Sequence, residues 1–217
     1  MIILSASLML GASAVFLVWR RRSINARAER IKQFAFPASI AQKVKAVYPH
    51  LTDAQTATVM NGLREYFQIS LMTDRRMVSM PSKVVDVAWH EFILFTKLYQ
   101  NFCRTAMGRF LHHTPSEAMR TPTQAQTGIK RAWRLSCKRE VINPSTPTRL
   151  PLLFAIDAML AIPDGYRYSL NCQSNADTYC ASHIGCGSES GGSSSNDGCS
   201  GSSDSGGSDG GGGCGGD

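Results

Sequence analysis

Residues 81–108 read PSKVVDVAWHEFILFTKLYQNFCRTAMG and carry the clearest helical pattern in the chain. Apolar and aromatic side chains recur in this stretch at spacings of three and four residues, which places them on one face of an α-helix. Pro81 suits the first turn of a helix and Gly108 suits its end, so the pattern predicts one long helix between them. The buried stripe of this helix consists of Val85, Trp89, Phe92, Thr96, Tyr99 and Cys103.

Helical periodicity continues on both sides of this stretch. Thr52, with Gln55 three residues later, forms a capping box that opens an earlier helix. Residues 150–162 are apolar nearly all round except for Asp157, as expected of a short helix at the centre of a core. No segment shows the sustained two-residue alternation of a half-buried strand. The sequence therefore predicts an all-α fold, with a compact helical domain over residues 23–170.

The N-terminal stretch is apolar. Residues 2–19 contain no charged side chain, and three arginines follow at positions 20–22. Eighteen helical residues rise about 27 Å, close to the roughly 30 Å hydrocarbon core of a bilayer. Because arginine stays on the cytoplasmic side, residues 1–22 are expected to form an uncleaved single-pass anchor in the cytoplasmic membrane, with the N-terminus outside and the body in the cytoplasm. Membrane lipid is then the partner of this helix.

Cleaved secretion is the rival interpretation of the N-terminus. A signal peptide normally begins with positive side chains and ends at a cleavage site made of small residues. Here the arginines follow the apolar stretch, and the small residues at positions 12–14 lie inside it. The pattern favours the anchor.

The C-terminal residues 187–217 have a composition that cannot form a core. They include 13 glycines, 10 serines and five acidic residues, and they contain no basic residue. We expect a disordered, glycine-rich tail, because chain entropy outweighs what such residues gain by burial. With 23 basic and 16 acidic residues in the chain, the tail carries a net charge of −5 and the preceding part +12. No recognised nucleic-acid motif accompanies the basic residues, so nucleic acid is not expected as a partner.

Residues 171–186 contain a cluster of cysteine and histidine. Cys180, His183 and Cys186 are spaced as Cys-x-x-His-x-x-Cys, and Cys172 lies eight residues before the first of them. Three thiolates and one imidazole can close a tetrahedral zinc site, so zinc is the one cofactor that the sequence predicts. The alternative is that these cysteines pack as small apolar residues or remain free thiols.

One motif in the long helix resembles that of a known family. The motif consists of Val85, Asp86, Trp89 and His90, with Tyr99 and Cys103 downstream. Together with the glycine-rich tail, it resembles the bacterial glycine-rich domain-containing proteins over residues 81–168. The resemblance implies membership of a group without an established activity.

Asp86 and His90 are the strongest candidate site residues in the helical domain. Four residues apart on one helix, they share a face and can form a hydrogen bond. In the functional interpretation, His90 is a metal ligand or general base that Asp86 orients, and His112 and His113 arrive from neighbouring turns. Glu91 and Cys103 are further candidate ligands of the same site. In the plain interpretation, Asp86 and His90 are a polar pair on a helix surface.

Two functions are compatible with these features. The sequence favours a non-enzymatic, membrane-anchored helical module that binds or scaffolds a protein partner, because it contains no nucleotide-binding loop, nucleophile elbow or His-Glu-x-x-His helix. The alternative is a metal-dependent enzyme using Asp86, His90 and His112 or His113. The enzyme gains support if Asp86 and His90 line an open pocket with a histidine of the next loop, and it loses support if His90 is packed and hydrogen-bonded. The biological process, substrate and oligomeric state are not predicted.

Overall fold

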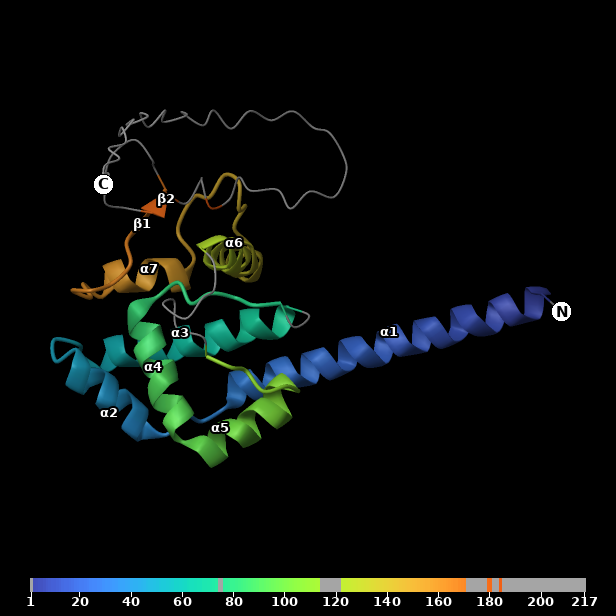
Figure 1. Ribbon diagram of the computed structural model, residues 1–217, viewed down its shortest axis with the longest axis horizontal. Helices are drawn as coiled ribbons and strands as arrows, with labels where there is room; N and C mark the ends of the chain where they lie inside the picture. The colour runs from blue at the N-terminus through green and yellow to red at the C-terminus, as the bar shows by residue number, and fades with distance from the viewer. Residues whose placement is uncertain (1, 74–75, 114–121, 171–178, 181–183, 185–217) are drawn as a thin grey trace, which may run out of the picture. The chain divides into compact units, whose positions relative to one another are not determined.

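The computed structural model describes residues 2–73, 76–113, 122–170, 179–180 and 184 (Figure 1). These residues form a mostly helical domain, which confirms the predicted fold class. The helices are α1 (Ile2–Gln33), α2 (Ala38–Val47), α3 (Asp53–Met72), α4 (Lys83–Leu94), α5 (Thr96–Phe102), the π-helix η1 (Cys103–Met107), α6 (Pro122–Arg139) and α7 (Leu152–Met159).

α3 lies at the centre of the domain, where it packs against α4, α1, α6 and α7 (Figure 1). It begins with the predicted capping box: the Thr52 hydroxyl accepts from the Gln55 backbone N–H, and the Gln55 side chain accepts from the Thr52 N–H. Gly62 lets α4 approach closely, because a Cβ at this position would lie 2.8 Å from a methyl carbon of Val85. The close packing of α4 on α3 therefore depends on glycine at position 62, which has no Cβ.

The long helix predicted after residue 81 is interrupted at Phe95, which ends α4 and precedes α5. Phe92 and Phe102 lie on opposite sides of this break, yet their ring centroids are 5.3 Å apart. Ten residues of continuous helix would separate them by about 15 Å along the axis. The chain turns at Phe95, and this turn lets both rings pack in one aromatic cluster. The predicted helix stop at Gly108 is confirmed, because Gly108 has a left-handed backbone with a φ of 71°.

A buried carboxylate fixes the start of α4. Asp157, on α7, is 2% exposed. Its two oxygens accept hydrogen bonds from the Ser82 hydroxyl at 2.7 Å and from the backbone N–H groups of Lys83 at 2.7 Å and Val84 at 3.3 Å. A fourth bond comes from the Tyr166 N–H at 2.9 Å. The one charged residue in an otherwise apolar helix therefore caps a second helix that is distant in the sequence.

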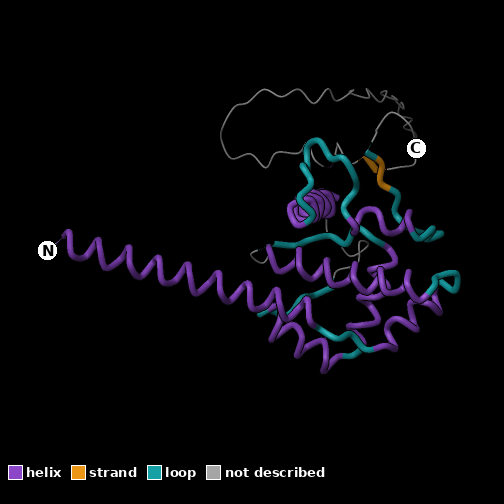
Figure 2. The backbone as a smooth tube through the Cα atoms, turned by 180° about the vertical axis from the view of Figure 1, so that it is seen from behind, coloured by secondary structure: helices purple, strands orange, loops and turns teal. Residues whose placement is uncertain are grey.

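The prediction of a single-pass membrane anchor is wrong. No helix in the described part of the chain is long and apolar enough to cross a bilayer. The apolar stretch is not a separate element that stops at the arginines, because α1 continues through positions 20–22 to Gln33 as one helix (Figure 2). The polar end of α1 belongs to the domain: Ile31 is fully buried, and the Gln68 side chain donates to the Ala28 carbonyl at 2.7 Å. The predicted localisation in the cytoplasmic membrane, with the N-terminus outside, depended on this anchor and is wrong as well.

A short parallel pair of strands, which the sequence pattern does not predict, follows α7. β1 (Tyr168–Ser169) pairs with β2 (Tyr179–Cys180), with Tyr168 opposite Tyr179. Ile184 is 9% exposed and belongs to the hydrophobic core. The predicted disordered tail, 187–217, and most of the Cys/His cluster lie outside the described residues.

Replacing Asp157 with asparagine should lower the free energy of unfolding by about 3 kcal/mol, because the amide nitrogen cannot accept and leaves buried donors without a partner. Chemical denaturation measures the loss. Asp164→Asn is the matched control, since Asp164 is a nearby exposed aspartate with one hydrogen bond, from the Tyr48 hydroxyl. Equal losses in the two variants would show that the Asp157 cap does not stabilise the domain.

Candidate functional site

The structure brings together three of the predicted site residues. Asp86 and His90 lie on α4, and His113 comes from the segment that follows η1 and returns toward α4 (Figure 1). The Nε2 atom of His113 lies 2.9 Å from one carboxylate oxygen of Asp86, and the Nδ1 atom of His90 lies 3.6 Å from the other. The two imidazole rings are in contact, with centroids 4.1 Å apart. We call these three residues the Asp-His-His cluster.

A chain of hydrogen bonds positions His113. The indole N–H of Trp89 donates to the Tyr99 hydroxyl at 3.1 Å, and the Tyr99 hydroxyl donates to the Leu111 carbonyl. Burial raises the pKa of the Tyr99 phenol, so this group stays protonated and remains a donor at neutral pH. Trp89 also contacts the His113 ring edge to face, with centroids 4.6 Å apart. The loop is therefore fastened two residues before the histidine that it presents.

The geometry of the cluster fits a metal ion. One donor atom from each of the three residues can be chosen so that all lie within 4.8 Å of one another. The two measured separations, 2.9 and 3.6 Å, run from His113 and His90 to different oxygens of Asp86, so both imidazoles lie beside the same carboxylate. The His113 side chain is 11% exposed, Asp86 24% and His90 49%, so one side of the cluster is open to solvent.

The other candidates do not join the cluster. The His112 ring packs against Phe110 instead, with centroids 4.8 Å apart. Glu91 forms an ion pair with Lys43 at 2.6 Å. Cys103 is buried, and desolvation raises the pKa of its thiol, which disfavours the thiolate that metal binding needs.

The predicted zinc ligands of the Cys/His cluster lie mostly outside the described residues. Cys172, His183 and Cys186 lie outside the described residues, and the described part of Cys180 is its backbone in β2. The zinc site formed by these four residues stays a prediction.

Comparison with known proteins places the chain in one family. The uncharacterised family described as UCP032817-like matches residues 26–188, which is most of the chain. The chain belongs to the UCP032817-like family. No curated protein and no solved structure matches it.

The resemblance to the glycine-rich domain-containing proteins is wrong, because the match is to the UCP032817-like family and nothing points to a glycine-rich one. Most of the motif that suggested it has a structural explanation in this fold. Val85, Trp89, Tyr99 and Cys103 are buried core residues of the helical domain. Spacing of this kind is imposed by helix packing, and a glycine-rich tail is a matter of composition, so neither is specific to one family.

Sequence reasoning missed the role of two aromatic residues in this UCP032817-like domain. Trp89 and Tyr99 were assigned to the core, and they are buried, but their polar tips also hold the loop that carries His113. A signal existed, because buried tryptophan and tyrosine usually find a hydrogen-bond partner. The identity of that partner, a backbone carbonyl at Leu111, could not be deduced from residue types.

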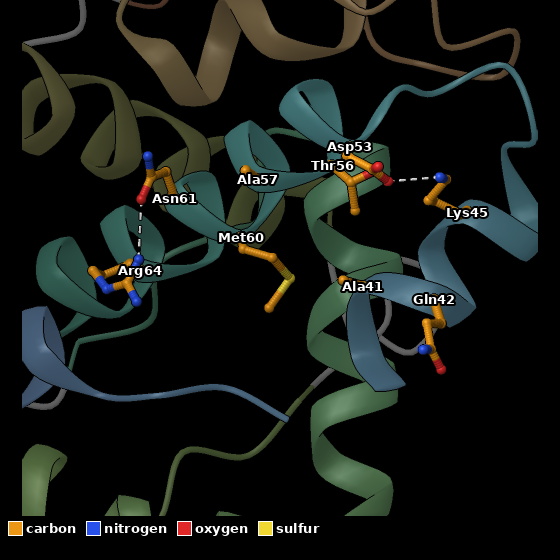
Figure 3. Close-up of a pocket in the computed structure, with 9 residues that line it drawn as sticks. All are labelled: Ala41, Gln42, Lys45, Asp53, Thr56, Ala57, Met60, Asn61 and Arg64. Atoms are coloured by element: carbon orange, nitrogen blue, oxygen red, sulfur yellow. Dashed lines mark hydrogen bonds and ion pairs between the residues drawn. The ribbon is translucent and has the colours of Figure 1, made fainter. Parts of the chain in front are cut away.

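A separate cavity of about 540 Å³ lies between α2 and α3 (Figure 3). Its charged residues are engaged with one another or with their neighbours: Lys45 pairs with Asp53 at 2.8 Å, and Arg64 donates to Asn61 at 3.0 Å. Met60 lies between these two pairs and supplies an apolar wall. The cavity has no residue in common with the Asp-His-His cluster.

Replacing Tyr99 with phenylalanine should lower the free energy of unfolding by about 1 to 3 kcal/mol, because the buried Trp89 N–H loses its acceptor and the Leu111 carbonyl loses its donor. Thermal and chemical denaturation measure this loss. Tyr48→Phe is the control, since it removes a hydroxyl whose partner, Asp164, is exposed. If the two variants lose the same stability, the hydroxyl of Tyr99 does not fasten the loop.

Proposed function

We propose that this UCP032817-like domain is a metal-binding module that holds one divalent transition-metal ion in the Asp-His-His cluster. The observation that carries the proposal is the convergence of two imidazoles and one carboxylate from a helix and a distant loop. Imidazole nitrogen and carboxylate oxygen are ligands of zinc and similar ions. The proposal takes its ligands from the residues that the sequence assigned to the metal-dependent alternative, Asp86, His90 and His113, but it does not include the enzymatic reaction.

A simple latch between loop and helix explains only part of this arrangement. The hydrogen bond between His113 and Asp86 is sufficient to fasten the loop to α4. It does not account for His90, whose Nδ1 faces the second oxygen of the same carboxylate at 3.6 Å, too long for a good hydrogen bond. A metal ion between the three groups would satisfy the second imidazole and the second oxygen together.

The cluster supplies an open site. Three protein ligands leave the fourth position of a tetrahedral ion to water or to an external ligand, as in zinc sites that exchange ligands. The half-exposed His90 places that position toward solvent. Asp86 lies in the first turn of α4, so the helix holds its carboxylate at the end that meets the loop of His113. The residues bind and orient the ion, and the proposal assigns no reaction to it.

Calorimetric titration of the metal-free full chain with Zn²⁺ tests this function. Replacing His90 or His113 with alanine should weaken zinc binding by more than the roughly 10- to 100-fold that loss of a group supporting a ligand costs. Mg²⁺ should not compete, because imidazole suits zinc and magnesium prefers oxygen ligands. The measurement is made in a Cys180→Ser background, so that the predicted cysteine site does not add to the signal.

His112→Gln is the matched control, because it removes an adjacent exposed imidazole that lies outside the cluster. Zinc binding should be unchanged in this variant. If His90→Ala binds zinc as tightly as the parent chain, His90 is not a ligand and the latch between Asp86 and His113 is sufficient. Thermal denaturation of each variant shows whether a loss of binding reflects unfolding.

We keep a second zinc ion, held by Cys172, Cys180, His183 and Cys186, as a separate proposal supported by ligand type and spacing. Elemental analysis of the purified full chain should show the zinc content fall by about one ion per chain in Cys180→Ser. Cys137→Ser is the control, because Cys137 is buried and free. An unchanged zinc content in Cys180→Ser would exclude the cysteine site.

A further inference from the structure

A pocket rich in arginine opens where α1, the end of α3 and the turn after η1 meet. Its volume is about 510 Å³, within the range of small-molecule sites. Arg20 and Arg27 reach it from α1, and Arg109 reaches it from the turn. Trp19 and Met72 supply apolar wall. We call this the arginine pocket, and it shares no residue with the Asp-His-His cluster.

The charges around the arginine pocket are unbalanced. Three guanidinium groups line it, and none of its described lining residues carries a carboxylate. Part of this charge faces helix C-termini, because α3 ends at Met72 and η1 ends at Met107, and each end carries up to about half a negative charge. Arg109 is engaged in this way, with its guanidinium 3.3 Å from the Ser70 carbonyl. These partial charges are smaller than the two full positive charges of Arg27 and Arg109.

Arg27 makes no hydrogen bond or ion pair with any residue that the structure describes. Its guanidinium lies against Gly108, where an added Cβ would come within 2.2 to 2.6 Å of three guanidinium atoms. Gly108 therefore makes the left-handed turn and also leaves the space that the Arg27 head occupies. The Arg27 head is therefore packed, while its N–H groups have no acceptor among the described residues.

The wall that carries Arg27 is anchored to the domain. One turn further along α1, the Arg30 side chain donates to the Thr105 carbonyl at 2.9 Å, and Ile31 is fully buried. These contacts hold α1 against η1, so the Arg27 position relative to the turn is preorganised. Preorganised guanidinium groups bind phosphate well, because the planar fork forms two parallel hydrogen bonds with its oxygens.

The apolar side of the arginine pocket indicates that its ligand also has an apolar part. Trp19 is 64% exposed and offers an aromatic face beside Arg20, and Met72 is 38% exposed at the end of α3. An inorganic anion would leave these surfaces in water. A flat ring stacked on the indole would cover them, because bases stack favourably on aromatic side chains.

We propose that the arginine pocket binds a small organic phosphate that carries a flat ring, of which a nucleoside diphosphate is the representative. The phosphates lie between Arg27 and Arg109, and the ring lies on Trp19. This binding does not require the metal ion of the Asp-His-His cluster, so the two proposals can fail separately.

The test is calorimetric titration of the full chain with adenosine diphosphate, pyrophosphate and adenosine, at low salt and with a chelator present. The chelator removes metal ions that would bring phosphate to the Asp-His-His cluster. Adenosine diphosphate should bind most tightly, pyrophosphate more weakly, and adenosine not measurably. Arg27→Gln should weaken diphosphate binding roughly tenfold or more, since it removes a charge-assisted contact.

Arg104→Gln is the matched control, because it removes the same charge from an exposed position of η1 outside the pocket. It should leave binding within about twofold of the parent chain, as expected when only distant screened charge is lost. Trp19→Leu should weaken adenosine diphosphate but not pyrophosphate. Absence of phosphate binding at millimolar concentration, or equal losses in Arg27→Gln and Arg104→Gln, would overturn the proposal. Thermal denaturation verifies that each variant is folded.

Discussion

The carboxylate of Asp157 is the interaction on which the arrangement of the domain depends. It joins α7 to the start of α4 across more than 70 residues, and it satisfies backbone N–H groups that have no partner within the helix. Its charge also lies where the helix dipole favours an anion. Because this contact holds the first residues of α4 against α7, it contributes to the placement of Asp86 and His90 further along the same helix. The placement of the candidate site therefore depends on the hydrogen bonds of a buried carboxylate outside the site, as well as on the candidate ligands themselves.

The aromatic core and the candidate metal site share residues: Trp89 packs in the core and also supports the loop that carries His113. Trp89 packs on α3 beside Tyr66, and its N–H begins the hydrogen-bond chain that ends at the loop before His113. When packing already holds the residues that support a site, binding an ion costs little additional conformational entropy. The packing of Trp89 and Tyr99 therefore supports the proposed metal-binding role of the Asp-His-His cluster. The break at Phe95 contributes to the same packing, because it lets α5 return Tyr99 toward Trp89.

Local signals in the sequence were reliable where local physics decides the outcome. The capping box at Thr52 and the stop at Gly108 both occur, because they depend on residues within one turn of the chain. The break at Phe95 was missed, since no glycine or proline marks it and the cause is a contact between rings ten residues apart. The membrane anchor was a wrong prediction, because an uncharged stretch does not reveal that its helix continues into a polar half that packs in the domain.

The spacing of Asp86 and His90 was sufficient to place them on one face, because the period of an α-helix is a property of the backbone. The choice between His112 and His113 was beyond the sequence. Neighbouring residues in a loop point in different directions, and their directions depend on how the loop is fastened. Here the Tyr99 hydroxyl fastens it at Leu111, so His113 faces Asp86 and His112 faces Phe110. The sequence by itself determines the residue types and their spacing along each helix. The meeting of Asp86, His90 and His113 is decided only by the tertiary structure, because it requires distant segments to pack together.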